Sequence, residues 1–264
     1  MAQNIQIKYC NYFFENYKKN VHSQNGEDGV IEEMLKRLDI NKGFVCEIGI
    51  DNIEKYSNTF NLIKKGFNAL LIEGNTNKYN EITKVIKNIK NVKAVNSDVN
   101  SDITIDSILK KEDVPNDLDI LSINNSGNEY NIWKSLQKYK PKILIIKINS
   151  GINPTNNEHI HSSKCDGTSF FPMYNLGTEK GYKFVLHTGN MVFVRNDLYE
   201  RLHITYTNPL ENFFPKWFLE QEQSQNKNKN SFINNSQMPS TDIKAEKKKL
   251  NINNPLINKA TNIL

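Results

Sequence analysis

The stretch GYKFVLHTGNMVFVRND, residues 181–197, contains two runs of β-forming residues separated by Thr188 and Gly189. A glycine in a short link between two such runs is typical of a β-hairpin, whose two strands are antiparallel. The stretch therefore predicts that the chain's sheet is finished by an antiparallel hairpin rather than by another parallel crossover.

Upstream of this hairpin, short apolar runs alternate with segments of helical spacing. The expected strands are GFVCEIG, NALLIEGN, VKAVNSD, DLDILSI and KILIIKIN, and helical segments such as SQNGEDGVIEEMLKRL and KYNEITKVIKNI separate them. Strands that alternate with helices predict a parallel sheet with right-handed crossovers. The predicted fold class is α/β: a doubly wound, mostly parallel, seven-stranded sheet with a terminal antiparallel hairpin.

The composition separates a folded region from a basic tail. From Glu222 onward there are seven Lys and three acidic residues, so the tail carries about +4 of the chain's net charge of +5. The tail is rich in Asn, Gln, Ser and Lys, a composition that cannot bury enough apolar surface to offset the entropy of ordering. We predict a folded domain over residues 1–220 and a disordered tail over 221–264. Nucleic-acid binding is not expected except through this tail.

Cysteine use and hydropathy indicate a cytoplasmic, intracellular protein. The longest apolar run, ILIIKI, is too short to span a bilayer, and the N-terminus lacks a signal-peptide pattern. Cys10, Cys46 and Cys165 are widely spaced and do not suggest disulfides. The segment HIHSSKC, expected to be a loop, offers His159 and His161 beside Cys165, but no fourth ligand is evident and no metal site is expected.

Several segments together resemble the FkbM-like methyltransferases. They are SQNGEDGVIE, EIG, SNTFNLIKKGFNALLIEGN, DLDILSI with GNEYNIWKSL, INP, and GTSFFPMYNLGTEKGYKFVLHTGNMVFVRNDL, in that order over about residues 22–199. A parallel sheet that ends in an antiparallel hairpin is also the outline of class I S-adenosylmethionine-dependent methyltransferases. We therefore expect residues 1–220 to form a methyltransferase-like domain, and the resemblance implies that S-adenosylmethionine lies over the ends of its first three strands.

Residues at those strand ends fit this role. Gly49 would let the backbone approach the cofactor closely, the Glu73 carboxylate can accept hydrogen bonds from both ribose hydroxyls, and Asp98 or Ser97 can accept from the adenine amino group. Glu27 lies in a first helical turn, where negative charge is favourable in any case, or it stands with Gln24 beside the cofactor's entrance. The full set of cofactor-binding candidates is Gln24, Glu27, Glu47, Gly49, Asn52, Glu73, Ser97 and Asp98.

The chain departs from the family's pattern in its acidic residues. Asn52 and Ile53 stand where the family has an acid followed by glycine, so strain or a narrowed pocket is expected at Ile53, and Asp51 could compensate for the missing acid. After the fourth strand an Asp-x-Asp-Gly turn is replaced by Asn124, Asn125, Ser126 and Gly127, and Lys147 replaces a Glu after the fifth. Neutral Asn cannot accept a proton near neutral pH or supply charge to Mg²⁺.

Two functions remain open. The first is methyl transfer to an oxygen of a small molecule or sugar, which can proceed by alignment alone if the acceptor is already nucleophilic. The second is a catalytically inactive protein of the same fold that serves as a binding or interaction module. A homodimer is one partnership that either function would allow. Catalytic residues are unknown from the sequence, and the candidates are Asn124, Lys147, Asn149 and His187.

Overall fold

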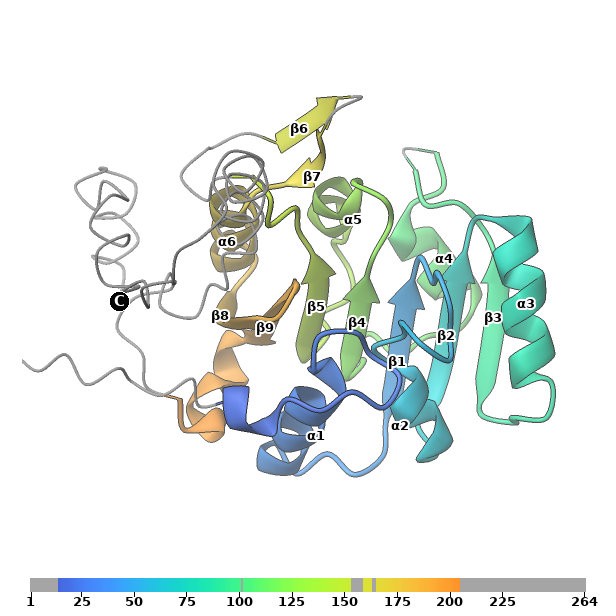
Figure 1. Ribbon diagram of the computed structural model, residues 1–264, viewed down its shortest axis with the longest axis horizontal. Helices are drawn as coiled ribbons and strands as arrows, with labels where there is room; N and C mark the ends of the chain where they lie inside the picture. Colours follow the sequence, from blue (N-terminus) through green and yellow to red (C-terminus); the bar gives the residue numbers. More distant parts are fainter. Residues whose placement is uncertain (1–13, 101, 153–158, 163–164, 205–264) are drawn as a thin grey trace, which may run out of the picture.

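The computed structural model describes residues 14–100, 102–152, 159–162 and 165–204 (Figure 1). The expected tail over 221–264 lies outside the described residues. A seven-stranded sheet with the order β3-β2-β1-β4-β5-β9-β8 forms the centre of the domain. The first five of these strands pair in parallel, whereas β9 is antiparallel to both β5 and β8. The predicted fold class, with its terminal hairpin, is confirmed.

The elements follow the predicted alternation. The strands are β1 (Phe44–Ile48), β2 (Asn68–Glu73), β3 (Val92–Asn96), β4 (Ile120–Ile123), β5 (Ile143–Lys147), β6 (His159–Ser162), β7 (Cys165–Thr168), β8 (Tyr182–His187) and β9 (Asn190–Arg195). The helices are α1 (Glu27–Arg37), α2 (Phe60–Lys64), α3 (Thr76–Ile86), α4 (Ile105–Lys111), α5 (Glu129–Ser135) and α6 (Phe170–Glu179), with short 3₁₀ turns η1 (Glu15–Tyr17) and η2 (Asn196–Leu202).

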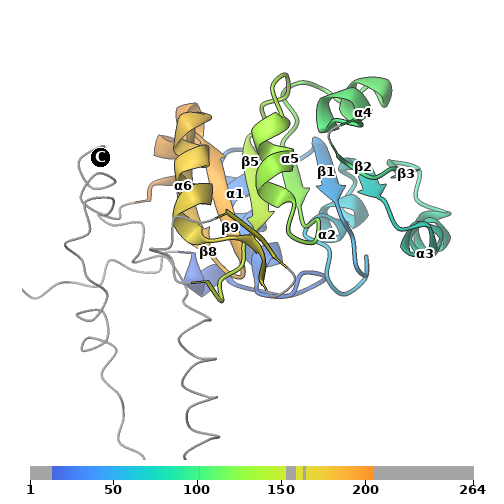
Figure 2. The ribbon, with the colours of Figure 1, turned by 90° about the horizontal axis from the view of Figure 1, so that it is seen from above.

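The sheet lies between two layers of helices (Figure 2). Side chains of α1, α2 and α3 pack with Val45, Ile143 and Ile145 on one face. Those of α4, α5 and α6 pack with residues such as Cys46 and Leu144 on the other. Alternate residues of a strand point to opposite faces, so strands covered on both sides are apolar throughout, as in the runs from which they were predicted.

The segment after β5 was expected to be a loop, and that expectation was wrong. β6 and β7 pair there as a two-stranded antiparallel ribbon, in which His159 lies opposite Thr168. The ribbon is separate from the main sheet. A short run with two histidines and no apolar alternation carries no strand signal. Within the described residues, no helix is both long and apolar enough to cross a membrane.

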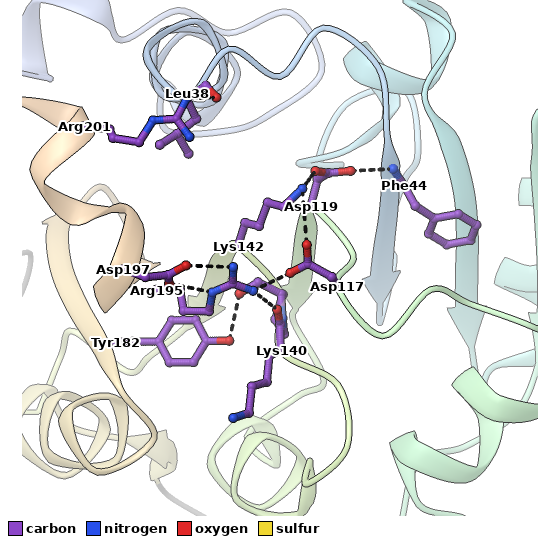
Figure 3. Close-up of polar contacts among 11 residues, drawn as sticks. Leu38, Phe44, Asp117, Asp119, Lys140, Lys142, Tyr182, Arg195, Asp197 and Arg201 are labelled. Atoms are coloured by element: carbon purple, nitrogen blue, oxygen red, sulfur yellow. Dashed lines mark hydrogen bonds and ion pairs between the residues drawn. The ribbon is translucent and has the colours of Figure 1, made fainter.

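Charged side chains fasten the terminal hairpin to the amino ends of the parallel strands (Figure 3). Arg195, at the end of β9, donates two hydrogen bonds to the Asp197 carboxylate, at 2.7 and 3.0 Å. Its guanidinium also bonds Asp117 and, at 3.0 Å, the Lys140 carbonyl oxygen. These residues precede β4 and β5, so Arg195 joins three segments at the edge of the sheet opposite to the one where the parallel strands end.

Candidate functional site

The carboxyl ends of β1, β2 and β3 meet at one edge of the sheet, and Glu73 links the loops there. Its two oxygens accept hydrogen bonds from the backbone N–H groups of Ile50, at 2.7 Å, and Asn75, at 2.8 Å. The residue is 7% exposed. Since each carboxylate oxygen can accept about two hydrogen bonds, one acceptor position on each oxygen is left for a ligand.

Position 49 requires a glycine because another loop of the protein packs directly against it. It has a φ of 73°, and a Cβ built on it would lie 2.0 Å from the carbonyl oxygen of Asn124. The loop after β4 therefore occupies the space that a side chain at position 49 would need. The sequence predicted close approach of the cofactor at this glycine, whereas the close approach in the structure is that of the β4 loop.

Glu47 is a buried anchor for the loop that enters α2. One carboxylate oxygen accepts from Ser57 Oγ, at 2.5 Å, and Thr59 Oγ1, at 2.7 Å. The other accepts from the Asn58 backbone N–H, at 2.9 Å, and Ser122 Oγ, at 3.4 Å. Burial raises the pKa of this carboxyl, while the hydrogen bonds oppose the increase. With two protein donors on each oxygen, Glu47 orders a loop in this conformation and offers no acceptor to a cofactor.

The loop after β1 shows no strain at Ile53. This residue is 3% exposed and packs in the core on the α1 side of the sheet. It is absent from the non-glycine residues with positive φ that the structure describes, so the expected strain is not found. Asn52 is exposed, and its side-chain oxygen accepts from the backbone N–H groups of Glu54 and Lys55, both at 3.1 Å. Asn52 thus closes a local turn at the start of this loop.

Two exposed acidic side chains, Asp51 and Asp98, lie in the loops that follow β1 and β3. Asp98 is exposed and lies against Gly74, where a Cβ would be 3.3 Å from Asp98 Cα. The Ser97 backbone N–H donates to the Glu73 carbonyl oxygen at 3.2 Å. Asp51 pairs with Lys78 Nζ at 2.7 Å, and this hydrogen bond raises the pKa of Lys78. The structure therefore brings Gly49, Glu73, Ser97 and Asp98 to one part of the edge, as predicted from the strand ends.

Glu27, another predicted cofactor ligand, lies away from the edge that carries Glu73. It is fully buried, and one of its oxygens accepts from Thr188 Oγ1, at 2.7 Å, and Asn190 Nδ2, at 2.8 Å. The other accepts from the Asn25 backbone N–H at 2.8 Å. Glu27 therefore fixes the start of α1 to the tip of the β8–β9 hairpin, and β1, β4 and β5 lie between β9 and the strand that carries Glu73. Gln24, in the same loop, is exposed.

The sequence did not single out His22, which joins this loop to the loop after β1. Its Nδ1 is 2.6 Å from the Glu54 carbonyl oxygen, and its ring packs edge-on against Phe60. Ser122 was also missed. A serine between Leu121 and Ile123 in a buried strand was the available signal, because a buried hydroxyl needs a partner, here Glu47 and Asn58.

The four catalytic candidates lie in the loop after β4, at and after the end of β5, and in β8. Asn124 donates its backbone N–H to the Ile48 carbonyl oxygen at 2.9 Å, and Asn149 accepts from the Gly151 N–H at 3.0 Å. Lys147 is exposed, and His187 is 1% exposed within β8. The four are spread over the ends of β4 and β5 and the terminal hairpin. Among the described residues, no three His, Cys, Asp or Glu side chains gather as a metal site.

Comparisons with known proteins find only distant structural likenesses. No family model matches the chain and no curated protein matches it, so the FkbM-like resemblance rests on the segments quoted above. Solved structures do match. A SAM-dependent methyltransferase from Aquifex aeolicus is 13% identical, with 70% of this chain and 92% of that chain covered and a TM-score of 0.38. M. capricolum TrmK, in complex with S-adenosyl-homocysteine, is 16% identical, with 87% and 96% covered and a TM-score of 0.43. Both likenesses are too distant to bear on function.

Proposed function

We propose that this chain binds S-adenosylmethionine over the carboxyl ends of β1, β2 and β3 and transfers its methyl group to an oxygen of a small molecule or sugar. The observation that carries the proposal is the position of Glu73 beside the switch in strand order. The chain runs outward from β1 through β2 to β3 and then returns to place β4 on the other side of β1. Open α/β sheets bind ligands in the crevice at such a switch.

The residues around Glu73 fit the cofactor chemically. Glu73 retains one acceptor position on each oxygen, which matches the two hydroxyls of a ribose. Asp98 is exposed and can accept from an adenine amino group. When bound, S-adenosylmethionine supplies an electrophilic methyl group on a positively charged sulfur, and the carboxylates of Glu73 and Asp98 favour a cationic ligand.

A second candidate is an inactive protein of the same fold that binds a partner. Three observations favour it. Glu47 is saturated by protein donors. Ile50 and Ile53 anchor the loop after β1 in the core. In the loop after β4, the amides of Asn125 and Gly127 donate to Glu129, so that loop is capped internally.

Titration calorimetry with S-adenosylmethionine and S-adenosylhomocysteine tests the proposal. The full chain should bind both saturably, and Asp98→Ala should weaken binding about tenfold or more, because a hydrogen bond to a charged group contributes about 1.5–3 kcal/mol. Asp98 is exposed and its variant should fold normally. Glu179→Ala, an exposed acid at the end of α6, is the matched control and should bind as the native chain does.

The outcomes separate the two candidates. Saturable binding weakened by Asp98→Ala, followed by transfer of a radiolabelled methyl group to an acceptor panel, supports a methyltransferase. Binding with no transfer to any acceptor supports the inactive alternative with a preserved cofactor site. Absence of binding by the folded chain rejects the cofactor site and leaves the partner-binding alternative.

A further inference from the structure

The two halves of the sheet's carboxyl edge differ in exposed charge. On the β1–β3 half, Asp98 is exposed to solvent, and so is Asp51, which pairs with Lys78 Nζ at 2.7 Å. On the β4, β5 and β9 half, two acidic side chains that the structure describes are both buried, Glu27 at 0% and Glu129 at 2% exposure. Glu129 accepts hydrogen bonds from the backbone N–H groups of Asn125 and Gly127, at 2.9 and 3.2 Å. Its carboxylate therefore stabilises the loop after β4.

Lys147 gives this second half an exposed positive charge. It is the last residue of β5, it is exposed, and it lies directly opposite Asn190 in the antiparallel pair with β9. Cross-strand partners project from the same face of a sheet, and Asn190 holds the buried Glu27 on that face. Lys147 forms no ion pair with any side chain that the structure describes. Its ammonium group is therefore available to an anion from solvent.

We propose that Lys147, with Asn190 beside it, forms an acceptor subsite for a carboxylate-bearing substrate. The assignment of this subsite to an acceptor rests on the proposed methyltransferase function, whereas its preference for anions does not. The exposed Asp98 carboxylate on the first half suits the cationic donor, and the exposed Lys147 ammonium group on the second half suits an anionic acceptor. A neutral or cationic acceptor would leave Lys147 without a counter-charge in the occupied site.

A carboxylate acceptor also explains why the site can lack a general base. A carboxylate oxygen is deprotonated near neutral pH, so no proton has to be removed before it reacts. Its lone pair forms the new bond to the methyl carbon while the C–S bond breaks and its electron pair goes to sulfur. The negative oxygen and the positive sulfonium become a neutral methyl ester and a neutral thioether. The neutral side chains of Asn124 and Asn125 are compatible with this step, since they need only orient the acceptor.

The test is an anion titration followed by ¹⁵N NMR on the full chain, with acetate as the probe. Acetamide, its neutral isostere, and sodium chloride at the same ionic strength are the controls. Acetate should saturably shift the amide signals of Lys147 and Asn190, and neither control should do so. Lys147→Gln should weaken acetate binding at least tenfold. Lys84→Gln, which removes an exposed lysine of α3, should have no effect.

Two results would overturn the proposal. One is acetate binding that Lys147→Gln leaves unchanged, and the other is shifts of equal size with acetamide or chloride. Titration with S-adenosylhomocysteine in the same samples keeps this test separate from that of the proposed function. If acetate binds at Lys147 but the cofactor product does not bind at all, the anion subsite stands and the methyltransferase function falls.

Discussion

Replacement of Asp119 by alanine should destabilise the fold far more than the same replacement at Asp117, two residues earlier. Asp119 lies at the amino edge of the sheet, where one oxygen accepts from the Phe44 backbone N–H at 2.8 Å and the other from Lys142 Nζ at 2.7 Å (Figure 3). Its side chain is 7% exposed, against 61% for Asp117. Gly43 has no room for a side chain because a Cβ there would lie 1.8 Å from an Asp119 oxygen.

The expected loss in the free energy of unfolding follows from the two groups that lose their hydrogen-bond acceptor in the alanine variant. A buried N–H at Phe44 without an acceptor costs about 1–3 kcal/mol. Removing one partner of a fully buried ion pair costs about 3–5 kcal/mol. The Lys142 side chain is 24% exposed and retains Asp117 at 3.6 Å, so a smaller penalty of about 1 kcal/mol applies to it. Asp119→Ala should therefore lower the free energy of unfolding by about 3 kcal/mol, and Asp117→Ala by less than about 1 kcal/mol.

Urea denaturation followed by far-UV circular dichroism measures both variants. With a denaturant slope of about 2 kcal/mol per molar urea, the Asp119→Ala midpoint should fall by about 1.5 M. Asp119→Asn keeps an acceptor for Phe44 and should lie between the native chain and the alanine variant. Equal midpoint shifts for the variants at positions 119 and 117 would refute the reasoning, because the difference in burial would then have no energetic consequence.

Three further predictions concern the loops and the hairpin. Gly49→Ala should lower the free energy of unfolding by about 2 kcal/mol or more, since it combines left-handed strain with the contact to Asn124, and unchanged thermal denaturation would contradict this. The Arg195 hydrogen bonds lower the pKa of Asp197. This stabilisation is present above the unfolded pKa of about 3.9 and is lost as pH falls through the folded pKa, so Asp197→Asn should flatten the acid limb of stability against pH. Glu27→Ala should speed hydrogen exchange at the hairpin tip, and unchanged exchange there would show that this carboxylate does not hold the hairpin.

The fold could be predicted from the sequence because its signals are local. The two β-forming runs around Thr188 and Gly189 became β8 and β9, and the apolar runs upstream became β1 to β5. Each strand end follows its own run, so the gathering of Glu73 and Asp98 at one edge follows from parallel pairing. These features depend on residues that lie within a few positions of one another.

The roles of individual carboxylates could not be predicted, because their partners are distant in the sequence. Glu27 bonds Thr188, 161 residues away, and Glu47 bonds Ser122, 75 residues away. The local sequence around a glutamate at a strand end is the same whether its side chain binds a ligand or anchors a loop. Only the donors around it decide, and these depend on how separate segments pack.

A crystal structure of the chain grown with S-adenosylhomocysteine tests most directly whether the edge formed by β1, β2 and β3 holds S-adenosylmethionine, as we propose. We predict electron density for the ligand over this edge, with the ribose hydroxyls at Glu73 and the adenine amino group at Asp98. Density at another place, or a well-ordered edge without ligand at saturating concentration, would contradict the proposal.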